Sequence, residues 1–300
     1  MSTRAGFVAL IGEPNAGKST LTNRMVGAKV SIVTHKVQTT RARIRGVAME
    51  GEAQIVLVDT PGLFRPRRHL DRAMVAAAWG GAADADVVVL LIEAHRGITK
   101  GVEDILASLK ELSARPVALA INKIDRVKSE VLLGLTEEMT QRYDFAKVFM
   151  ISAEKGFGVA DLKTWIGEHL PEGPWLYPED QIADLPMRML AAEVTREKLT
   201  LRLHQELPYQ LTVETETWEE RKDGSVRIDQ VIYVMRDGHK GIVLGKKGET
   251  IKAISTLARE DLCEFMGRPV HLFLQVKVRP NWLEEPERYR EMGLDFSDGR

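Results

Sequence analysis

The segment Gly12-Glu-Pro-Asn-Ala-Gly-Lys-Ser19 determines the fold expected for the first part of the chain. It matches the pattern G-x-x-x-x-G-K-S, follows an apolar run at Phe7–Ile11, and opens a helical stretch at Ser19–Val26 that Gly27 ends. A strand that turns through glycines into a helix points several backbone N–H groups, and the positive helix end, at one anion. The pattern therefore predicts a phosphate-binding loop, and the alternative is a glycine-rich turn with a stray lysine.

Continuous apolar runs recur along the first half of the chain. The predicted strands are Phe7–Ile11, Ile55–Val58, Val87–Ile92, Val117–Ile121 and Val148–Ile151. Because these runs do not alternate with polar residues, each is expected to be buried on both faces of a mostly parallel sheet. Amphipathic stretches at Val102–Leu112 and Val131–Tyr143 lie between them. The order predicts a doubly wound α/β domain over residues 1–172, with helices on both faces.

The character of the sequence changes at Leu170–Pro178, where three prolines and a glycine predict a linker, placed at 173–184. The elements expected after it are a helix at Leu185–Leu203, strands at Tyr209–Thr217 and Val226–Met235, a helix at Glu249–Phe265 and a strand at Val270–Val278. They predict a smaller α+β domain over 185–282, followed by a C-terminal tail at 283–300.

Composition limits the classes of protein to consider. Of the 300 residues, 44% are hydrophobic and 28% are charged, the balance of a soluble globular protein. A net charge of −1 means that any nucleic-acid surface has to be local. The single cysteine, Cys263, excludes an intrachain disulfide and a cysteine zinc cluster and fits a reducing compartment. No apolar run is long enough to span a membrane, so a cytoplasmic protein is expected.

Three further motifs each follow a predicted strand. Asp59-Thr-Pro-Gly62 offers a carboxylate for Mg²⁺ and a Gly62 N–H for the γ phosphate. In Asn122-Lys-Ile-Asp125, the Asp125 carboxylate is expected to accept hydrogen bonds from N1–H and the 2-amino group of guanine, and adenine has neither donor. Ser152-Ala-Glu154 is expected to offer a backbone N–H to guanine O6. Each motif alone also fits an ordinary loop, but the ordered set predicts a GTP site.

The residues expected at this site fall into overlapping groups. Lys18 is expected to reach the β and γ phosphates, and Mg²⁺ is expected on Ser19, Asp59 and Thr40, with Thr39 barely distinguished from Thr40 by the sequence. The catalytic set is Lys18, Asn15, Thr40 and Gly62. The residues expected to contact GTP or GDP are Gly12, Glu13, Pro14, Asn15, Ala16, Gly17, Lys18, Ser19, Thr20, Asp59, Thr60, Pro61, Gly62, Leu63, Asn122, Lys123, Ile124, Asp125, Ser152 and Ala153.

The position after Asp59-Thr-Pro-Gly62 indicates slow hydrolysis. Ras-like enzymes often orient the attacking water with a glutamine there, whereas this chain has Leu63, which cannot hydrogen-bond water. An activating partner or ion is therefore expected. The side-chain oxygen of Asn15, in the phosphate loop, is a candidate ligand for K⁺, and the chain resembles cation-activated GTPases that carry asparagine at this position.

The second domain contains Ile242-Val-Leu-Gly-Lys-Lys-Gly248-Glu-Thr-Ile251, in which G-x-x-G carries two lysines. Such a loop between two helices lets RNA phosphates approach the backbone, as in a KH domain. Between Arg236 and Arg279 nine Lys/Arg and five Asp/Glu give a local charge of +4 (9 − 5). The expected RNA contacts are Ile242, Gly245, Lys246, Lys247, Gly248, Ile251 and Lys252. The alternative is a helix-capping loop with solvated lysines.

Taken together, these motifs resemble the Era family of Ras-like GTPases, with Gln38-Thr-Thr-Arg41 as a further match and Ala16 in place of the more frequent valine. The resemblance covers nearly the whole chain and implies a P-loop GTPase domain followed by a type II KH domain. It also implies binding to the 3′ end of 16S rRNA, a role in assembly of the small (30S) ribosomal subunit, and peripheral contact with the inner face of the cell membrane. A monomer is expected.

Two other functions remain open from the sequence. One is a GTPase switch whose C-terminal domain binds a protein or a membrane rather than RNA. The other is a tRNA-modification GTPase, which is disfavoured because the sequence shows neither an extra catalytic domain nor a terminal cysteine.

Overall fold

The computed structural model describes residues 2–34, 36, 44–64, 66, 68–110, 115–184, 186–204, 207–292 and 294–297. The chain forms two compact units. The first consists of Met1–Ser31, Thr40–Asp184 and Tyr289–Arg300, and the second of Ile32–Thr39 and Leu185–Arg288. Each unit has its own sheet and its own hydrophobic core.

The sheet of the first unit has the order β2-β3-β1-β4-β5-β6. Its strands are β1 (Arg4–Gly12), β2 (Ile44–Glu50), β3 (Ala53–Asp59), β4 (Val87–Glu93), β5 (Val117–Asn122) and β6 (Lys147–Met150). Every pair is parallel except β2 with β3. The five predicted strands are confirmed, and β3, β4 and β5 are buried along their whole length, as continuous apolar runs require. The additional strand, β2, lies at the edge.

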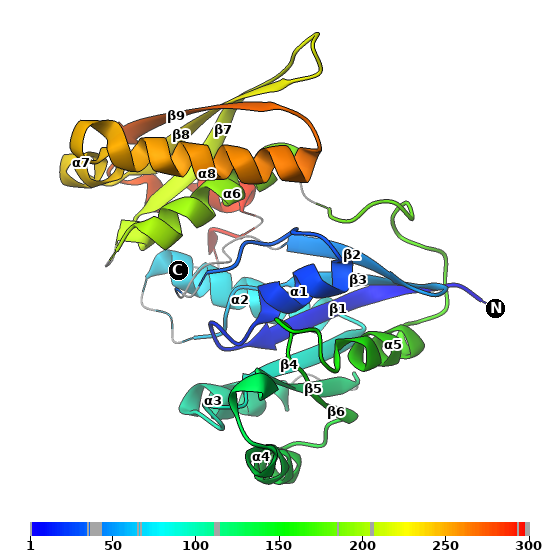
Figure 1. Cartoon of the computed structure of the whole chain (residues 1–300). Helices are drawn as coiled ribbons and strands as arrows, with labels where there is room; N and C mark the ends of the chain where they lie inside the picture. The colour runs from blue at the N-terminus through cyan, green and yellow to red at the C-terminus, as the bar shows by residue number, and fades with distance from the viewer. Residues whose placement is uncertain are drawn as a thin grey trace. The chain divides into compact units, whose positions relative to one another are not determined.

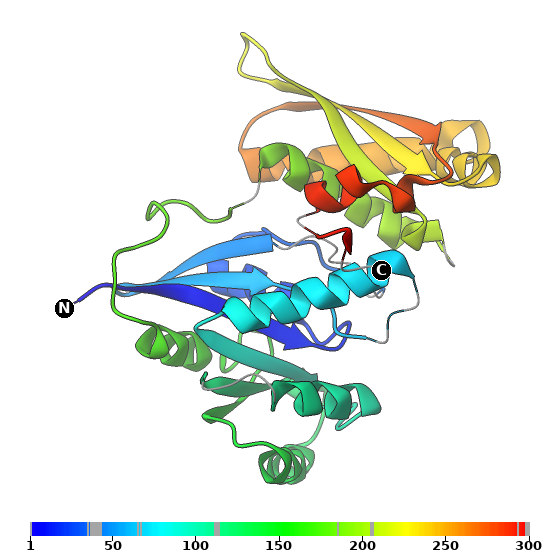
Figure 2. The same cartoon turned by 180° about the vertical axis from the view of Figure 1, so that it is seen from behind.

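Helices cover both faces of this sheet, which confirms the doubly wound class. They are α1 (Lys18–Val26), α2 (His69–Asp84), α3 (Lys100–Leu109), α4 (Ser129–Arg142) and α5 (Val159–His169), with a short 3₁₀ turn at Ile124–Arg126. One core layer contains residues of α1 and α5, and the other contains residues of α2, α3 and α4. Figure 1 shows α1 and α5 on the near face of the sheet, and Figure 2 shows α2 and α3 on the opposite face.

The topology places the predicted motifs at one edge of the sheet. In the sheet, β1 lies between β3 and β4: the chain first forms β2 and β3 on one side of β1 and then continues with β4 on the other side, so the strand order reverses at β1. In open α/β sheets, ligands bind at such a switch point, outside the carboxyl ends of the strands. Gly12, Asp59 and Asn122 are the last residues of β1, β3 and β5. The fold therefore brings the three motifs to one place.

The predicted linker, 173–184, belongs to the first unit and pairs with β2 at an isolated bridge between Gly46 and Ala183. Val47 N–H donates to the carbonyl oxygen of Ile182 (2.9 Å), and Asp184 N–H donates to that of Arg45 (2.9 Å). The buried Gln54 side chain also donates to the carbonyl oxygen of Tyr177 (2.8 Å). This segment therefore pairs along the β2 edge. Its last residue, Asp184, is also the last residue of the Thr40–Asp184 part of the first unit.

The second unit has a three-stranded sheet with β8 in the centre, antiparallel to β7 and parallel to β9. Its elements are α6 (Met187–Arg202), β7 (Leu211–Glu220), β8 (Val226–Val234), α7 (Asp237–Leu244), α8 (Glu249–Met266) and β9 (Val270–Val278). Short 3₁₀ turns lie at Leu207–Tyr209, Lys246–Gly248 and Trp282–Glu284, and α9 spans Pro286–Glu291. The helix–strand–strand–helix–helix–strand order confirms the predicted type II KH fold.

One face of the second sheet carries the core. Leu199 of α6, Val243 of α7 and Ile254 of α8 pack with apolar residues of all three strands. A second cluster continues the same layer toward the C-terminal end of α8, around Ala258 and Leu262. Because α7 and α8 are both anchored in this layer, the loop between them is held at a defined place. Among the described residues, no helix is long and apolar enough to cross a membrane.

Candidate nucleotide and nucleic-acid sites

The phosphate loop follows β1 through backbone conformations that its glycines permit. Gly12 has φ 152° and Gly17 has φ 103°, a region that residues with a Cβ rarely adopt. A Cβ on Gly12 would come 2.4 Å from the carbonyl oxygen of Leu91, and a Cβ on Gly17 would come 2.2 Å from Asn122 Nδ2. Asn15 is left-handed too (φ 67°), a conformation that asparagine tolerates better than most residues. The loop therefore requires glycine at both positions.

Lys18 lies inside this loop. Its ammonium donates to the carbonyl oxygens of Gly12 and Glu13, at 3.0 Å each, and the residue is buried. Burial lowers the pKa of Lys18 to about 8, although the carboxylates of Asp59, Glu13 and Glu93 oppose this. A buried cation whose hydrogen-bond partners, among the described residues, are carbonyl groups is poised to bind phosphate oxygens.

Asp59 and Ser19 provide oxygen atoms beside the loop. Asp59 Oδ2 accepts hydrogen bonds from Ser19 Oγ (2.7 Å) and Ser31 Oγ (2.6 Å). Asp59 Oδ1 is buried and has no hydrogen-bond partner among the described residues. An orphaned carboxylate oxygen next to a hydroxyl fits a hard cation with oxygen ligands, such as Mg²⁺. Burial raises the pKa of Asp59, and a divalent cation would favour its ionised form.

The segment after Asp59 lies against the phosphate loop. Leu63 N–H donates to the carbonyl oxygen of Gly12 (2.9 Å). A Cβ on Gly62 would come 2.8 Å from Pro14 Cα, so only glycine allows this approach. Thr60 is buried, and its hydroxyl donates to the carbonyl oxygen of Leu10 (2.7 Å). The motif is thus anchored through Thr60 and Leu63, with Gly62 between them beside the loop.

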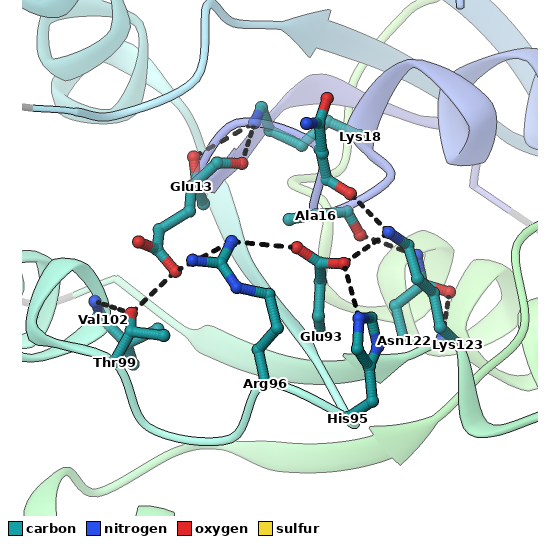
Figure 3. Close-up of polar contacts among 12 residues, drawn as sticks. Glu13, Ala16, Lys18, Glu93, His95, Arg96, Thr99, Val102, Asn122 and Lys123 are labelled. Carbon is teal, nitrogen blue, oxygen red and sulfur yellow. Dashed lines mark hydrogen bonds and ion pairs between the residues drawn. The ribbon is translucent and has the colours of Figure 1, made fainter. Parts of the chain in front are cut away.

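The Asn122–Asp125 motif connects the other loops to the phosphate loop. Asn122 Nδ2 donates to the carbonyl oxygen of Ala16 (2.8 Å), and Asn122 Oδ1 accepts from Ala153 N–H (3.0 Å). Lys123 Nζ donates to the carbonyl oxygen of Asn15 (2.7 Å) (Figure 3). A hydrogen bond from Ser152 holds the pKa of Asp125 below its usual range, so this exposed carboxylate is ionised at neutral pH. A charged acceptor therefore faces solvent beside the loop.

The loop between α7 and α8 carries the G-x-x-G motif of the second unit. Gly245 (φ 73°), Lys247 (φ 52°) and Gly248 (φ 80°) all have positive φ. A Cβ on Gly245 would come 2.1 Å from Thr250 Oγ1, so the chain passes against the first turn of α8 without room for a side chain. Lys246 and Lys247 are exposed. The loop therefore presents bare backbone and two cations together.

The other predicted RNA contacts lie on both sides of this loop. Ile242 on α7 is 56% exposed, which is unusual for a large apolar side chain, and Lys252 on α8 is exposed. Ile251 instead packs partly against the core. An exposed isoleucine next to two lysines offers an apolar surface for bases beside a charged surface for phosphates.

Comparison with known proteins agrees with the two domains that carry these candidate sites. A family model described as a 50S ribosome-binding GTPase matches residues 7–123, and a KH-domain model matches residues 206–283. A relative named GTPase Era from Dinoroseobacter shibae is 80% identical over 299 residues, which span 99% of this chain and 97% of the relative. The chain belongs to the Era family of GTPases. Another GTPase Era, from Rhizobium meliloti, is 65% identical over 294 residues, 98% of this chain and 94% of that relative.

Solved structures of Era have the same fold from end to end. A crystal structure of Era with MgGDPNP and nucleotides 1506–1542 of 16S ribosomal RNA is 38% identical in sequence, with a TM-score of 0.92 over 97% of this chain and 99% of that one. A single-substitution variant of Aquifex aeolicus Era bound to GDP.AlF4− gives the same values. The fold expected from the resemblance to Era is thereby confirmed for both domains.

Several predicted site residues of this Era-family chain lie in the core. Ala16 and Leu63 are each less than 5% exposed, and their side chains belong to the two core layers. Ala153 is buried, and its N–H, one of those in the motif expected to offer a backbone N–H to guanine O6, donates to Asn122 Oδ1. Thr39 and Thr40, predicted as the Mg²⁺-sensing threonines, lie outside the described residues.

Two residues near the Era-type site were missed by sequence reasoning. Ser31 bonds to Asp59, and nothing in its neighbourhood marks it, because it follows α1 in an irregular segment. Glu93 ends β4 and lies opposite Asn122 in the sheet register. Ligands bind at the carboxyl ends of parallel strands, and Glu93 is at the carboxyl end of β4, so this rule could have identified Glu93 from the sequence.

The burial of Lys18 predicts a pH dependence for the nucleotide-free protein. Between pH 8 and 10.5 the folded state holds Lys18 neutral while the unfolded state binds its proton, so stability rises with pH over this range. The free energy of unfolding is expected to increase by about 2 kcal/mol more in the wild type than in Lys18→Met. Urea unfolding at about pH 7.5 and about pH 9.5 measures this difference.

Bound nucleotide provides the internal control. Phosphates keep Lys18 charged, so with saturating GDP the extra stabilisation of the wild type at high pH is expected to disappear. Equal pH dependence of unfolding in nucleotide-free wild type and Lys18→Met would contradict the assignment of this buried lysine.

Proposed function

We propose that this Era-family GTPase is a GTP-switched protein that binds the 3′ end of 16S rRNA through its KH domain and assists assembly of the small ribosomal subunit. The observation that carries the proposal is the loop at Gly245–Gly248, with its bare backbone and exposed lysines. The related Era was crystallised with nucleotides 1506–1542 of 16S ribosomal RNA, which supports the same ligand class for this chain.

In the proposed nucleotide site, Lys18 and the loop amides bind the phosphates, and Asp125 selects guanine. Ser19 and Asp59 would hold Mg²⁺, as the orphaned Oδ1 of Asp59 supports, and the ion would supply positive charge to the β and γ phosphates. The N–H of Gly62 is assigned to the γ phosphate, because the peptide lies against the phosphate loop at Pro14. Thr40 would complete the site as the sensor of the ion.

Hydrolysis is proposed to be slow without an activator. Orienting the attacking water needs a polar side chain after Gly62, whereas Leu63 is buried in the core and offers none. The chain therefore has residues suited to bind the phosphates, but at position 63 it has no polar side chain to orient the attacking water.

A potassium ion is the proposed activator, bound through Asn15. This side chain is exposed on the phosphate loop, where a monovalent cation would add positive charge near the phosphates. GTP turnover by the purified protein is expected to be at least about tenfold faster in KCl than in NaCl, and Asn15→Asp is expected to change this ratio. Equal turnover of the wild type in both salts, measured by phosphate release, would rule out the ion.

The decisive experiment for the proposed function is to crosslink and sequence the RNA bound to the protein in cells. Reads are expected to accumulate at the 3′ end of 16S rRNA and to be lost in Lys246→Glu/Lys247→Glu. Recovery of a protein or membrane partner with no enrichment of RNA would instead support a C-terminal domain that binds a partner other than RNA. Cytoplasmic residence, expected from composition, stays a prediction, as do the peripheral membrane contact that the family resemblance implies and a monomeric state.

A further inference from the structure

Two carboxylates lie beside a loop that has to bind a polyanion. Glu93 ends β4 and is 7% exposed, and Glu13 is the second residue of the phosphate loop itself. Negative charges so close to the phosphates repel them, and this repulsion alone weakens nucleotide binding. The contacts of the two carboxylates indicate an effect that opposes this repulsion, because both carboxylates hold parts of the phosphate loop in position.

Glu93 acts on the loop through Lys123. Glu93 Oε2 lies 2.5 Å from Lys123 Nζ, and the same ammonium donates to the carbonyl oxygen of Asn15 at 2.7 Å (Figure 3). Two further side chains lie beside the carboxylate: the guanidinium Nη1 of Arg96 lies 3.2 Å from Oε1, and the imidazole Nε2 of His95 lies 3.6 Å from Oε2. A carboxylate this buried needs such partners, and Lys123 is the partner that also donates a hydrogen bond to the phosphate loop, at Asn15.

The two residues joined by this contact both have strained backbones. Asn15 has φ 67° and Lys123 has φ 63°, and left-handed residues other than glycine persist where their surroundings hold them. The Lys123–Asn15 hydrogen bond links one strained position to the other, and Glu93 fixes the orientation of the lysine. Without the carboxylate, the ammonium would be drawn toward solvent and its contact with Asn15 would weaken.

The Asn15 carbonyl matters because of the N–H on the other side of the same peptide. In a trans peptide the carbonyl oxygen and the following N–H point in opposite directions. When Lys123 holds the Asn15 oxygen on the outside, the Ala16 N–H is turned to the opposite side, where it donates to the carbonyl oxygen of Glu13 (3.3 Å) within the loop. Asn122 acts in the same way on the next peptide, through the carbonyl oxygen of Ala16.

Glu13 provides a second attachment on the other side of the loop. Its Oε2 accepts from Thr99 Oγ1 (2.7 Å), and Thr99 in turn accepts from Val102 N–H (3.1 Å) as the N-cap of α3. A Cβ on Gly101 would come 2.2 Å from Glu13 Oε1, so the carboxylate is closely packed there. The segment from Glu93 to Thr99 thus holds the phosphate loop directly at Glu13 and, through Lys123, at Asn15. Figure 3 shows Thr99 beside Glu13 and Glu93 beside Lys123.

We propose that Glu93 is a positioning residue for nucleotide binding. By keeping the Lys123 ammonium on the Asn15 carbonyl, it holds the Asn15–Ala16 peptide in place, and with it the turn that the Ala16 N–H closes on the Glu13 carbonyl oxygen, so that the phosphate loop keeps its shape. The inference rests on the proposed nucleotide site and adds to it a residue from outside the four sequence motifs. It also predicts the direction in which nucleotide affinity changes when the Glu93 charge is removed. Loss of a negative charge near the phosphates would by itself strengthen nucleotide binding, whereas loss of the positioning of Lys123 weakens it.

The test is the dissociation rate of fluorescently labelled GDP, measured by stopped flow. Glu93→Gln keeps the side-chain volume and removes the charge, and it is expected to raise the rate about tenfold. The matched control is Glu50→Gln on β2, which removes a carboxylate paired with Lys163 (3.7 Å) and is expected to leave the rate unchanged. Preference for GDP over inosine diphosphate is expected to stay at the wild-type value in Glu93→Gln, since Asp125 selects the base.

A double-mutant cycle separates positioning from a general loss of structure. Lys123→Ala alone is expected to release GDP faster than the wild type. If Glu93 acts through the lysine, adding Glu93→Gln to Lys123→Ala changes the rate by less than about twofold. Glu93→Asp, which keeps the charge but withdraws it from Lys123, is expected to be intermediate and serves as the second variant if Glu93→Gln melts at a lower temperature.

Two results would overturn the inference: GDP release from Glu93→Gln at or below the wild-type rate, or additive effects of the two substitutions in the cycle. Failure of the proposed nucleotide site is a distinct outcome, because the wild-type protein would then bind no labelled GDP at all.

Discussion

Replacing Asp125 by asparagine is expected to weaken GDP and GTP binding by a factor of about a hundred to about ten thousand. The carboxylate is ionised, because a hydrogen bond from Ser152 lowers its pKa, and it would accept from both N1–H and the 2-amino group of guanine. Each hydrogen bond to a charged group contributes about 1.5–3 kcal/mol. Asparagine loses the charge and turns an amide donor toward the 2-amino group, so one contact becomes repulsive.

The same substitution is expected to create affinity for xanthine nucleotides. Xanthine has a carbonyl oxygen in place of the 2-amino group, and the asparagine NH₂ can donate to it while Oδ1 accepts from N1–H. Competition between labelled GDP and unlabelled GDP or xanthosine diphosphate measures both effects. Asp144→Asn, an exposed substitution just after α4, is the matched control and should leave both affinities unchanged. Unaltered GDP binding by Asp125→Asn would show that guanine is selected elsewhere.

The positions of the main site residues were predictable because strand order and motif spacing act together. Gly12, Asp59 and Asn122 end buried strands, and parallel strands bring their carboxyl ends to one edge. The five predicted strands were recognisable as continuous apolar runs. The sixth, β2, contains Arg45, Gly46 and Glu50 and pairs at the edge of the sheet, where burial does not force an apolar run.

Contacts between side chains from different segments were not predictable in this way. Ser31 lies 28 positions from Asp59, and their hydrogen bond depends on how the segment after α1 folds back. Leu63 was expected among the residues that contact the nucleotide because of its place in a motif. In the structure its side chain belongs to a core cluster with residues of α2, α3 and α4, while its backbone N–H donates to the carbonyl oxygen of Gly12 in the phosphate loop.

Composition also predicted a separate linker where the structure has a segment that bridges to the edge strand β2. Prolines and glycine at 171–178 indicate irregular backbone, which the described structure confirms for most of that stretch. The residues just after it, Ile182–Asp184, pair with β2 through backbone hydrogen bonds that any sequence can form. Pairing of this kind leaves almost no signal in residue type, so the boundary could only be seen in the structure.

Substituting aspartate for Gly245 is expected to weaken binding of RNA from the 3′ end of 16S rRNA by at least about a hundredfold. Any Cβ at this position would overlap Thr250, at 2.1 Å from Oγ1 and 2.9 Å from the backbone nitrogen, so the loop has to move away from α8. The new carboxylate would also lie where phosphates are expected to approach. Both effects act on the clamp, and GDP binding by the first unit is expected to stay unchanged.

The matched control for this substitution is Gly224→Asp in the turn between β7 and β8. Gly224 also has a positive φ (81°), but a Cβ there meets no atom within 4 Å. It lies in the same unit and receives the same charge, so its RNA affinity is expected to stay near that of the wild type. Wild-type affinity in Gly245→Asp, measured by fluorescence anisotropy, would mean that RNA binds to another surface of the protein.

Salt dependence distinguishes a disturbed fold from a lost phosphate clamp. Each lysine that neutralises a phosphate of single-stranded RNA contributes about 0.7 to the slope of log affinity against log salt concentration. Lys246→Gln/Lys247→Gln is therefore expected to lower that slope by about 1.4, because both side chains are exposed and no glycine is altered. An unchanged slope would leave the two lysines as solvated surface charges, whereas the expected decrease would place the phosphate backbone directly on the Gly245–Gly248 loop.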